Sequence, residues 1–432
     1  MQYDFDTVID RRGRDAMAVD IPASGKGGHY LAHIQVEPGF DCIPMWIADM
    51  NFATAPCIPK ALAERSLHPL YGYFQETDAY YDAILNWQRD RHGVTGLTRE
   101  CIGYENGVLG GITSALRAVC APGEPVLVHS PTYVGFTHTL ADNGWEAVLS
   151  PLKKDENGVW RMDFADMEQK LKARHIHAAV FCSPHNPAGR VWERWELEQM
   201  MDLFARYDVT VISDEIWSDL VLPGYTHIPT QSVSEDARRT VAFYAPSKTF
   251  NLAGLNGSYH IIYDPALRDR VRRAGQQTHY NSQNVLSMHA LTAAYSAEGA
   301  RWLEELLTVL DRNADYAVRF IQEHFDGVTV ARPQGTYMLF PDCSAWCAAH
   351  GQTIDQLLAA GHRVGLVCKD EAGNEVLIPG STVICAVGQR SNRTAVDELR
   401  TCAPWVREIG DCVRVSNITN AVYQGYHAAL DI

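Results

Sequence analysis

The chain has 432 residues, of which 46% are hydrophobic and 21% are charged, so it is long enough for two or three domains and too apolar for a disordered or collagen-like protein. Its 37 basic and 52 acidic residues give a formal net charge of −15, which argues against nucleic acid or an anionic membrane as the main partner. The sequence contains no signal-peptide pattern and no run of about 18 apolar residues. Its 11 cysteines are scattered without paired metal-site spacing. We expect a cytoplasmic protein with free thiols and no metal site.

Residues 100–265 alternate short apolar runs with segments of helical period. Buried strands are predicted at 126–128, 178–181, 209–212, 241–244 and 259–262. Between two of them, apolar residues recur at i, i+3, i+4 and i+7, which predicts a helix whose buried face is Leu197, Met200, Met201 and Phe204. Strands that alternate with helices indicate the α/β class, with a mostly parallel, doubly wound sheet.

The pattern changes after residue 286. Apolar residues at 290–295 and 303–310 predict two long helices, and the segment 331–344 predicts a turn followed by a strand. We expect this region to form a second, smaller α/β domain. The Gly-rich stretch at 25–28 predicts a flexible loop near the start of the chain.

Residues with useful chemistry follow the predicted strands, where doubly wound sheets bind their ligands. They are Tyr133, Asn186, Asp214 and Lys248. Each has an ordinary alternative when it is taken alone. Tyr133 suits a core aromatic, Asn186 before proline suits a turn, Asp214 suits a helix N-cap, and Lys248 suits a solvated charge.

Together these residue types match one cofactor. A lysine amine forms a Schiff base with an aldehyde and can later act as a base. An aspartate keeps a pyridine nitrogen protonated, an asparagine amide donates to a phenolate oxygen, and an aromatic ring stacks on a cofactor ring. The Gly-rich stretch 107–111 opens a predicted helix, whose N-terminal N–H groups suit a phosphate. Pyridoxal phosphate meets all of these requirements.

Eight ordered motifs also carry a resemblance to known enzymes: IPMWIADMNF (43–52), YGYF (71–74), ENGVLGG (105–111), SPTYVGF (130–136), CSPHNPAGRVW (182–192), SDEIWSDL (213–220), APSKTFNLAGL (245–255) and PQGTYMLF (333–340). Over residues 1–366 the chain resembles the fold-type I pyridoxal-phosphate enzymes of the aminotransferase class I/II superfamily. Within them it is most similar to the cystathionine β-lyase-like C–S lyases.

The resemblance implies a role for each of the four residues that follow the strands. Lys248 would hold the cofactor and shuttle the α-proton of the substrate, and Asp214 would pair with the pyridinium. Asn186 would contact the ring oxygen and Tyr133 would stack on the ring.

The resemblance also implies how the phosphate is held. The backbone N–H groups of Val108 and Leu109 would bind it, and Tyr73 would reach the phosphate of a partner subunit in a homodimer with shared active sites. The pattern often has Ser three residues before the lysine, where this chain has Ala245. Phosphate binding would therefore depend more on Ser247 and on the helix N-terminus.

Two further positions depart from the family pattern. Asn256 stands where these enzymes often have an arginine, and Trp217 stands near the ring oxygen where they commonly have Tyr or His. An indole N–H donates a hydrogen bond but accepts no proton, so an acid–base role at position 217 is not expected.

The resemblance implies a C–S β-lyase that eliminates a thiol from a β-thio amino acid and yields pyruvate and ammonia. One alternative is a pyridoxal-phosphate-dependent aminotransferase, because the motifs specify the cofactor and not the bond that breaks. A further alternative is a protein that binds the cofactor but is catalytically impaired, and that serves a regulatory function.

Residues 367–432 leave this pattern and resemble the end of an FAD- and NAD-dependent reductase domain of the enoate reductase type. The resemblance rests on STVICAVGQRSN (381–392), the turn at 410–412 and the helix pattern at 420–428. The GxGxxG fingerprint of such a domain is missing from the sequence, so FAD binding is not expected. Arg414 is a candidate for the arginine that binds the substrate carboxylate, with a solvated strand arginine as the alternative.

The predicted organisation has four parts. Residues 1–50 form an N-terminal segment that joins the small domain and the dimer contacts, and 51–285 form the large cofactor-binding domain. Residues 286–366 form the small domain, and 367–432 are expected to complete it as a flavoprotein-like fragment.

Overall fold

The computed structural model describes residues 2–24, 45–277, 279, 281–354 and 356–357, and the backbone of 366–369 and 375–378. Its contacts divide the chain into two compact units. The first comprises Met1–Ile9 and Ala48–Trp346, and the second comprises Asp10–Ile47 and Cys347–Ile432. The boundary that the sequence predicts between a large and a small domain, at residues 285–286, does not coincide with the division between these units. The predicted organisation into four parts stays a prediction. The stretch at 25–28 and the segment around Arg414 lie outside the described residues.

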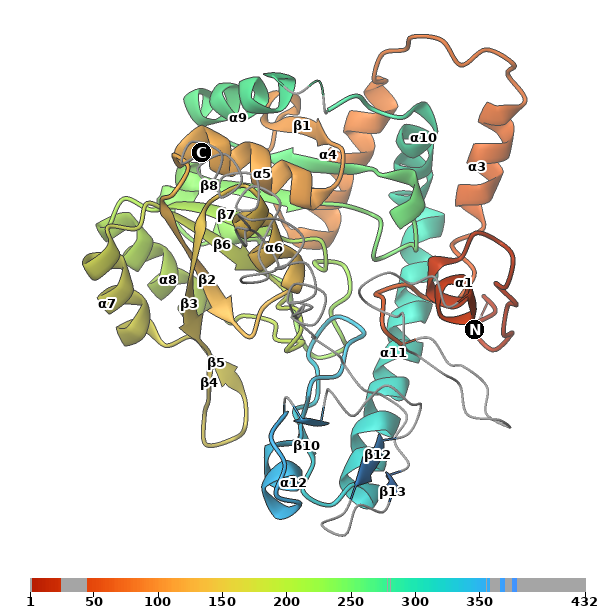
Figure 1. Ribbon diagram of the computed structural model, residues 1–432. Helices are drawn as coiled ribbons and strands as arrows, with labels where there is room; N and C mark the ends of the chain where they lie inside the picture. The colour runs from red at the N-terminus through yellow and green to blue at the C-terminus, as the bar shows by residue number, and fades with distance from the viewer. Residues whose placement is uncertain are drawn as a thin grey trace, which may run out of the picture. The chain divides into compact units, whose positions relative to one another are not determined.

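A seven-stranded sheet forms the centre of the first unit, with the strand order β1-β9-β8-β7-β6-β2-β3 (Figure 1). Neighbouring strands from β3 to β8 pair in parallel, whereas β9 is antiparallel to both β8 and β1. The mostly parallel sheet is the one that the sequence predicts. The strands are β1 (Ile102–Glu105), β2 (Pro125–Ser130), β3 (Glu146–Pro151), β6 (Ala178–Cys182), β7 (Thr210–Asp214), β8 (Thr240–Tyr244) and β9 (Ser258–Ile261).

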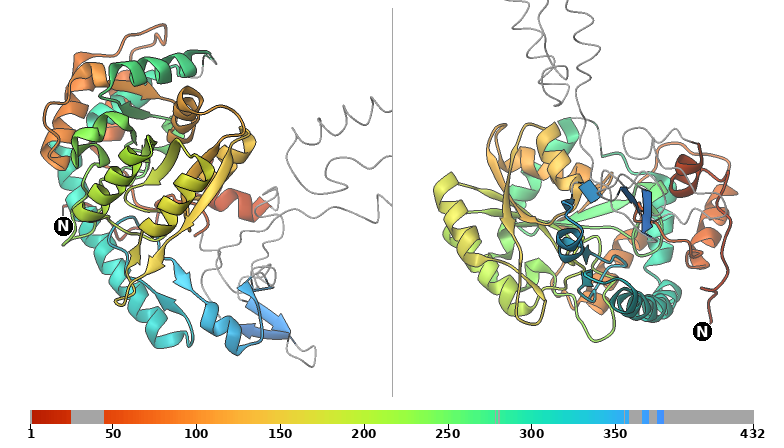
Figure 2. Two further views of the ribbon diagram at one scale, coloured as in Figure 1. Left: turned by 90° about the vertical axis from the view of Figure 1, so that its left-hand side faces the viewer. Right: turned by 60° about the horizontal axis from the view of Figure 1, so that its bottom comes forward.

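Helices pack on both faces of this sheet (Figures 1 and 2). The alternation within β2 shows the two faces, because Val126 and Val128 join one hydrophobic cluster whereas Leu127 joins another. Helices α5, α6 and α9 contribute to the first cluster, and α7 and α8 contribute to the second. These helices are α5 (Val108–Val119), α6 (Val134–Asp142), α7 (Phe164–Arg174), α8 (Arg194–Arg206) and α9 (Pro265–Gln277).

A third hydrophobic cluster involves the helices α3 (Cys57–Ser66), α4 (Asp78–His92), α10 (Val285–Ala294) and α11 (Ala297–His324). Ser296 caps α11 through a hydrogen bond from Gly299 N to its Oγ (3.2 Å). Helices α10 and α11 are the two helices that the sequence predicts after residue 286.

The shorter elements are β4 (Lys153–Lys154), β5 (Trp160–Arg161), β10 (Thr329–Val330), β11 (Pro341–Asp342), η1 (Arg99–Cys101), η2 (Thr230–Ser232), η3 (Glu235–Arg239) and η4 (Ala253–Leu255).

The strand predicted within 331–344 is nearly missing, because only Pro341–Asp342 is extended in a sheet and pairs with β10. Thr336 has φ +65°, in the left-handed region, which breaks an extended strand at its middle. The backbone at Gly335 passes close to the segment after β7, because an added Cβ would come within 3.0 Å of Leu220 O. Residues 331–340 thus form a tight connection and not a strand.

In the second unit, helix α1 (Met17–Ser24) lies beside Trp46, whose Nε1 donates to Ala18 O (3.0 Å). Strands β12 (Leu366–Lys369) and β13 (Glu375–Ile378) form an antiparallel pair. Helix α12 (Ser344–Ala349) crosses the division between the units. Among the helices that the structure describes, none combines the length and the apolar character needed to cross a membrane.

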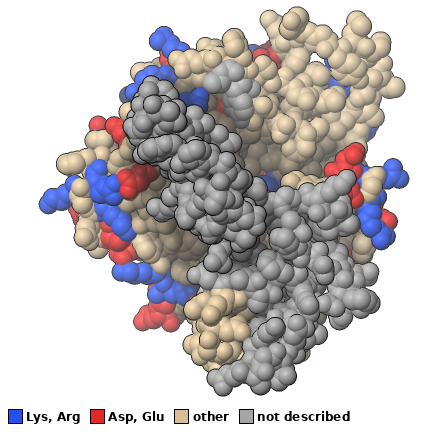
Figure 3. Space-filling model, viewed as in Figure 1, with Lys and Arg blue, Asp and Glu red and all other residues tan. Residues whose placement is uncertain are grey.

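Charged side chains of both signs are mixed over the part of the surface near α7 and α8, whereas the face at the upper right of Figure 3, where Figure 1 has α3 and the loop that leads to α4, shows few charged side chains. That loop contains several exposed apolar side chains, which are Leu67, Leu70, Tyr71, Tyr73 and Phe74.

Candidate active site

The sheet topology brings the predicted residues to one edge. Strands β2, β6, β7 and β8 are parallel neighbours or next neighbours, so their carboxyl ends meet there. The direction of β1 is the same, because β1 and β8 are each antiparallel to β9. The segments after these five strands carry the N-terminus of α5, Tyr133, Asn186, Asp214 and Lys248.

Lys248 lies in a tight turn that follows β8. Backbone hydrogen bonds from Phe250 N to Pro246 O (2.8 Å) and from Leu252 N to Ser247 O (2.9 Å) close this turn. Lys248 is partly buried, and its Nζ donates to Ala48 O (3.1 Å). Burial lowers the pKa of the Lys248 amine, against the opposing effect of the Asp214 carboxylate.

Asp214 is the last residue of β7 and is aligned with Cys182 on β6 and Phe243 on β8. Its side chain is 5% exposed, and its Oδ1 accepts a hydrogen bond from Ile216 N (3.0 Å). Burial raises the pKa of Asp214 to about 7, although the Ile216 hydrogen bond and the charge of Lys248 act in the opposite direction. A buried carboxylate of this kind is stabilised by a cation placed against it.

Asn186 and Tyr133 lie on the segments after β6 and β2, the next two strands of the sheet beyond β7. Asn186 is partly buried, and its backbone N donates to Cys182 Sγ (3.4 Å). Within the described part of the chain, the Asn186 side-chain amide makes no hydrogen bond. Tyr133 is 37% exposed at the start of α6, and its ring lies over Gly135, where an added Cβ would come within 2.4 Å of the ring.

The N-terminus of α5 lies at the same edge. Gly107 has φ +98°, which an L-residue rarely adopts, and the helix begins at Val108. Gly107 N donates to Ser258 Oγ (3.1 Å), so this N–H is already used. Val108 and Leu109 belong to the first turn of the helix, where backbone N–H groups have no carbonyl acceptor within the helix. They are placed to bind an anion.

A mostly buried hydrogen-bond network, which no sequence pattern predicts, supports this helix start. Glu105 Oε1 lies 2.7 Å from His260 Nδ1, and Glu105 Oε2 accepts from Asn281 Nδ2 (2.7 Å). Asn281 Oδ1 in turn accepts from Asn106 N (3.1 Å). The contacts join residues that are up to 176 positions apart, so no periodic pattern marks them.

Trp217 is 1% exposed and lies next to the lysine. Its ring centroid is 5.9 Å from Lys248 Nζ and 4.8 Å from the Tyr337 ring centroid, with an interplanar angle of 77°. Trp217 and Tyr337 therefore form one side of the space around Lys248. Ser247 is partly buried beside the lysine, and the buried Ala245 ends the preceding strand segment.

One described residue of the prediction is not brought to this edge. Tyr73 is fully exposed in the loop between α3 and α4. Arg414 lies outside the described residues, so its predicted role has no structural test.

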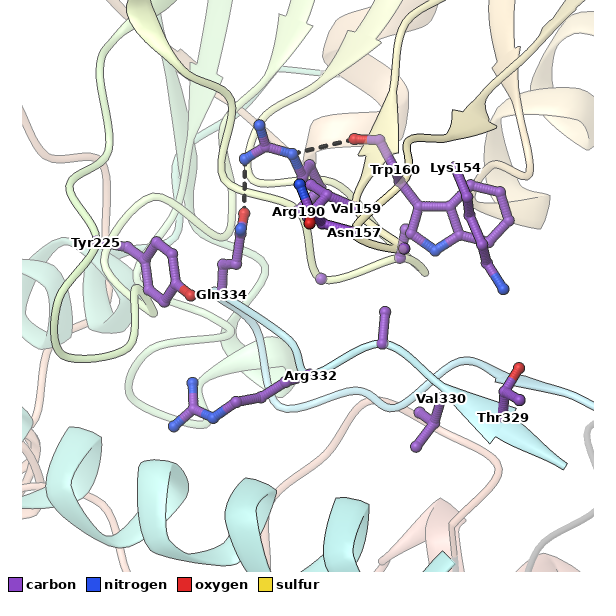
Figure 4. A pocket seen from close by; sticks show the side chains of 14 residues that line it. Lys154, Asn157, Val159, Trp160, Arg190, Tyr225, Thr329, Val330, Arg332 and Gln334 are labelled. Atoms are coloured by element: carbon purple, nitrogen blue, oxygen red, sulfur yellow. Dashed lines mark hydrogen bonds between the residues drawn. The ribbon is translucent and has the colours of Figure 1, made fainter. Parts of the chain in front are cut away.

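A cavity of about 430 Å³ elsewhere in the first unit contains none of the predicted residues (Figure 4). Its walls include Trp160, Tyr225 and Gln334. The buried Arg190 is already saturated there, because its Nη1 donates to Gln334 Oε1 (2.6 Å) and its Nε donates to Trp160 O (3.1 Å). Arg190 thus links two loops, and its guanidinium group is occupied by these hydrogen bonds and not directed at a ligand.

Comparisons with known proteins show which family the chain resembles. The chain is 36% identical over 322 residues to the cystathionine β-lyase PatB of Bacillus subtilis, which covers 74% of this chain and 82% of PatB. Cystalysin of Treponema denticola, whose crystal structure contains pyridoxal 5'-phosphate, is similar with a TM-score of 0.73 and 30% identity over 79% of this chain and 84% of cystalysin. The pyridoxal-phosphate-bound C–S lyase of Staphylococcus hominis is similar with a TM-score of 0.73 and 28% identity, over 86% and 93% of the two chains. Residues 41–396 match the family model for aminotransferase class I and II, and the chain belongs to that family.

Proposed function

We propose that this protein is a pyridoxal-phosphate-dependent C–S β-lyase, which eliminates a thiol from a β-thio amino acid and yields pyruvate and ammonia. The observation that carries the proposal is the convergence of Lys248, Asp214, Asn186, Tyr133 and the start of α5 at one edge of the sheet. The similarity to PatB and to the C–S lyase of Staphylococcus hominis favours the lyase among the activities of the family.

The residues at this edge fit pyridoxal phosphate. The buried Asp214 carboxylate, with its pKa raised to about 7, suits the cationic nitrogen of a pyridine ring. The first-turn N–H groups of Val108 and Leu109 suit a phosphate, with Ser247 as a further donor. The Asn186 amide suits the ring oxygen, and the exposed face of Tyr133 suits the ring itself. When it is bound, the cofactor supplies an electron sink for carbanion chemistry.

Lys248 performs the proton transfer in this proposal. Its Nζ is the group that would hold the cofactor, and the same amine would serve as the base. Because burial lowers the pKa of Lys248, this amine is more readily neutral and able to accept the α-proton of the substrate. Asp214 would keep the ring nitrogen of the cofactor protonated. Trp217 and Tyr337 exclude water from one side of Nζ.

The reaction is tested by turnover of L-cystathionine with pyruvate, ammonia and the released thiol measured together. A C–S β-lyase releases the three products in equal amounts, and Lys248→Ala abolishes their release. Lys170→Ala is the matched control, because Lys170 pairs with Asp166 on α7 outside the candidate site, and this variant is expected to leave turnover unchanged. Transfer of the amino group to a keto acid, with no thiol released, would show an aminotransferase instead.

We also propose that the protein is a homodimer with shared active sites. The loop between α3 and α4 exposes 84% of Leu67 and 68% of Leu70, and Tyr73 is fully exposed nearby. Several exposed apolar side chains on one loop suit a protein–protein interface. A second copy that covers the loop would bring Tyr73 to the phosphate of the partner subunit. This arrangement would give Tyr73 the function that the family resemblance implies.

Two further assignments belong to this proposal. Arg414 is assigned to the substrate carboxylate, on the basis of its place in the sequence. A cytoplasmic location suits the six cysteines that the structure describes, all of which are free thiols.

A further inference from the structure

Four buried ionisable side chains lie behind the candidate site, and the proposed chemistry does not use them. They are Glu215 and Asp219, which follow Asp214 on the same segment, and His92 and His227. Each of these side chains is at most 3% exposed. We call them the carboxylate–histidine cluster.

Asp219 is surrounded by donors. Its Oδ1 accepts from Trp87 Nε1 (2.9 Å) and lies 3.0 Å from His92 Nε2 and 3.4 Å from Arg91 Nε. Its other oxygen, Oδ2, accepts from Thr249 Oγ1 (3.1 Å). Thr249 is completely buried and directly follows Lys248.

Glu215 anchors the other end of the same segment. Its Oε2 lies 2.9 Å from His227 Nε2 and accepts from Tyr244 Oη (2.7 Å). Its Oε1 accepts from Thr230 N and from Ser213 Oγ, both at 3.0 Å. Every carboxylate oxygen of Glu215 and Asp219 therefore has at least one donor, as buried carboxylates require.

The two carboxylates are joined through the histidines. The rings of His92 and His227 meet edge to face, with centroids 5.4 Å apart and an interplanar angle of 85°. The cluster thus connects helix α4, the segment after β7, the loop near residue 227 and the lysine turn after β8. The segment that carries Asp214 and Trp217 is held at both of its ends.

The position of Lys248 depends on this connection. Its Nζ donates to Ala48 O, lies beside the Trp217 ring and interacts electrostatically with the Asp214 carboxylate. The backbone of the lysine turn determines whether Nζ reaches these groups. The Thr249–Asp219 hydrogen bond is a side-chain link between the lysine turn and the segment that carries Asp214. A shift of about 1 Å at a reacting group can cost about a hundredfold in rate.

We propose that Asp219 is a positioning residue for Lys248, which acts by holding the Thr249 hydroxyl and thereby aligns the lysine turn with the segment that carries Asp214 and Trp217. This inference rests on the proposed function, since it assigns Lys248 to the cofactor. Asp219 itself touches neither substrate nor cofactor in this account.

The test compares Thr249→Val, which keeps the shape of the side chain and removes its hydroxyl, with Thr249→Ser, which keeps the hydroxyl. Thr292→Val is the matched control, because Thr292 Oγ1 donates to Met288 O within α10, away from the lysine turn. Two quantities are measured on the full chain. One is the rate at which added pyridoxal phosphate becomes attached to Lys248, trapped with borohydride and followed by mass spectrometry, and the other is kcat and KM for L-cystathionine.

Thr249→Val is expected to slow attachment and kcat by about tenfold to a hundredfold with KM changed by less than about threefold, as expected for a misplaced reacting group. Thr249→Ser recovers most of both rates, and Thr292→Val retains them. Equal rates for Thr249→Val and the wild type, or equal losses in Thr249→Val and Thr249→Ser, would overturn the inference.

Asp219→Ala supplies a second variant, since it removes the carboxylate that accepts the Thr249 hydroxyl proton. The double variant Asp219→Ala/Thr249→Val is expected to be no slower than the slower single variant, because both changes remove the same hydrogen bond. Additive losses would contradict the inference, and Thr249→Val decides alone if Asp219→Ala does not fold. If the wild type attaches the cofactor but releases no pyruvate, the proposed function fails while the attachment rates still test the role of Asp219.

Discussion

Asp214 shows how the burial of one side chain makes cofactor binding depend on pH. Its pKa is raised to about 7 by burial, so the protonated form dominates below that pH in the cofactor-free protein. A pyridinium pairs with the ionised form, and binding below pH 7 must first remove the proton, at about 1.4 kcal/mol per pH unit. The contribution of Asp214 to affinity is therefore complete above pH 7 and decreases as the pH falls below it.

The prediction is measured as the dissociation constant of pyridoxal phosphate for the wild type and for Asp214→Asn at pH 6 and pH 8. The loss of affinity caused by the substitution is expected to be about tenfold smaller at pH 6 than at pH 8. Asp202→Asn, on the exposed side of α8, is the control and leaves affinity unchanged at both values. An equal loss at both pH values would show that Asp214 does not exchange a proton when the cofactor binds.

At the scale of elements, the start of α5 depends on side chains from distant segments. Asn281 bridges the Glu105 carboxylate and the Asn106 backbone, immediately before the Gly107 turn. We predict that Asn281→Ala weakens pyridoxal phosphate binding by about tenfold, equivalent to ~1.4 kcal/mol, since the first-turn N–H groups lose their fixed direction. The matched control is Asn313→Ala on the exposed side of α11, and the measurement is equilibrium titration with the cofactor. Unchanged affinity in Asn281→Ala would show that the helix start is rigid without this support.

The strands were predictable at this scale because they are apolar runs that end at polar residues. The predicted ranges 126–128, 178–181 and 241–244 lie within β2, β6 and β8. The antiparallel direction of β9 could not be predicted, since side-chain alternation is the same in either direction. The prediction of a strand in 331–344 was wrong. Apolar composition does not indicate that the backbone at Thr336 is left-handed.

In the candidate site, too, some residues could be predicted from the sequence and others could not. Asp214, Asn186, Tyr133 and Lys248 could be found because each follows a strand and its chemistry fits the same cofactor. The residues that hold them could not be found. The Thr249–Asp219 and Asn281–Glu105 hydrogen bonds join positions 30 and 176 residues apart, and only the folded topology brings them together.

At the scale of the whole molecule, shared active sites predict complementation between two inactive variants. A Lys248→Ala chain and a Tyr73→Ala chain, when co-expressed, form mixed dimers in which one of the two sites contains both native residues. Statistical mixing then restores about a quarter of the wild-type activity, as symmetry requires. The measurement is turnover of the purified mixture, with sedimentation to establish the dimer. Activity no greater than the sum of the separate variants would contradict shared sites.

Every role proposed for this sheet edge depends on Lys248 as the residue that carries the cofactor. Borohydride reduction of the purified protein with pyridoxal phosphate, followed by peptide mass spectrometry, tests this assignment directly. We predict a single pyridoxyl-phosphate mass on the peptide that contains Lys248, and its loss in Lys248→Arg. A stoichiometric label on any other lysine, or no label at all, would show that Lys248 does not carry the cofactor.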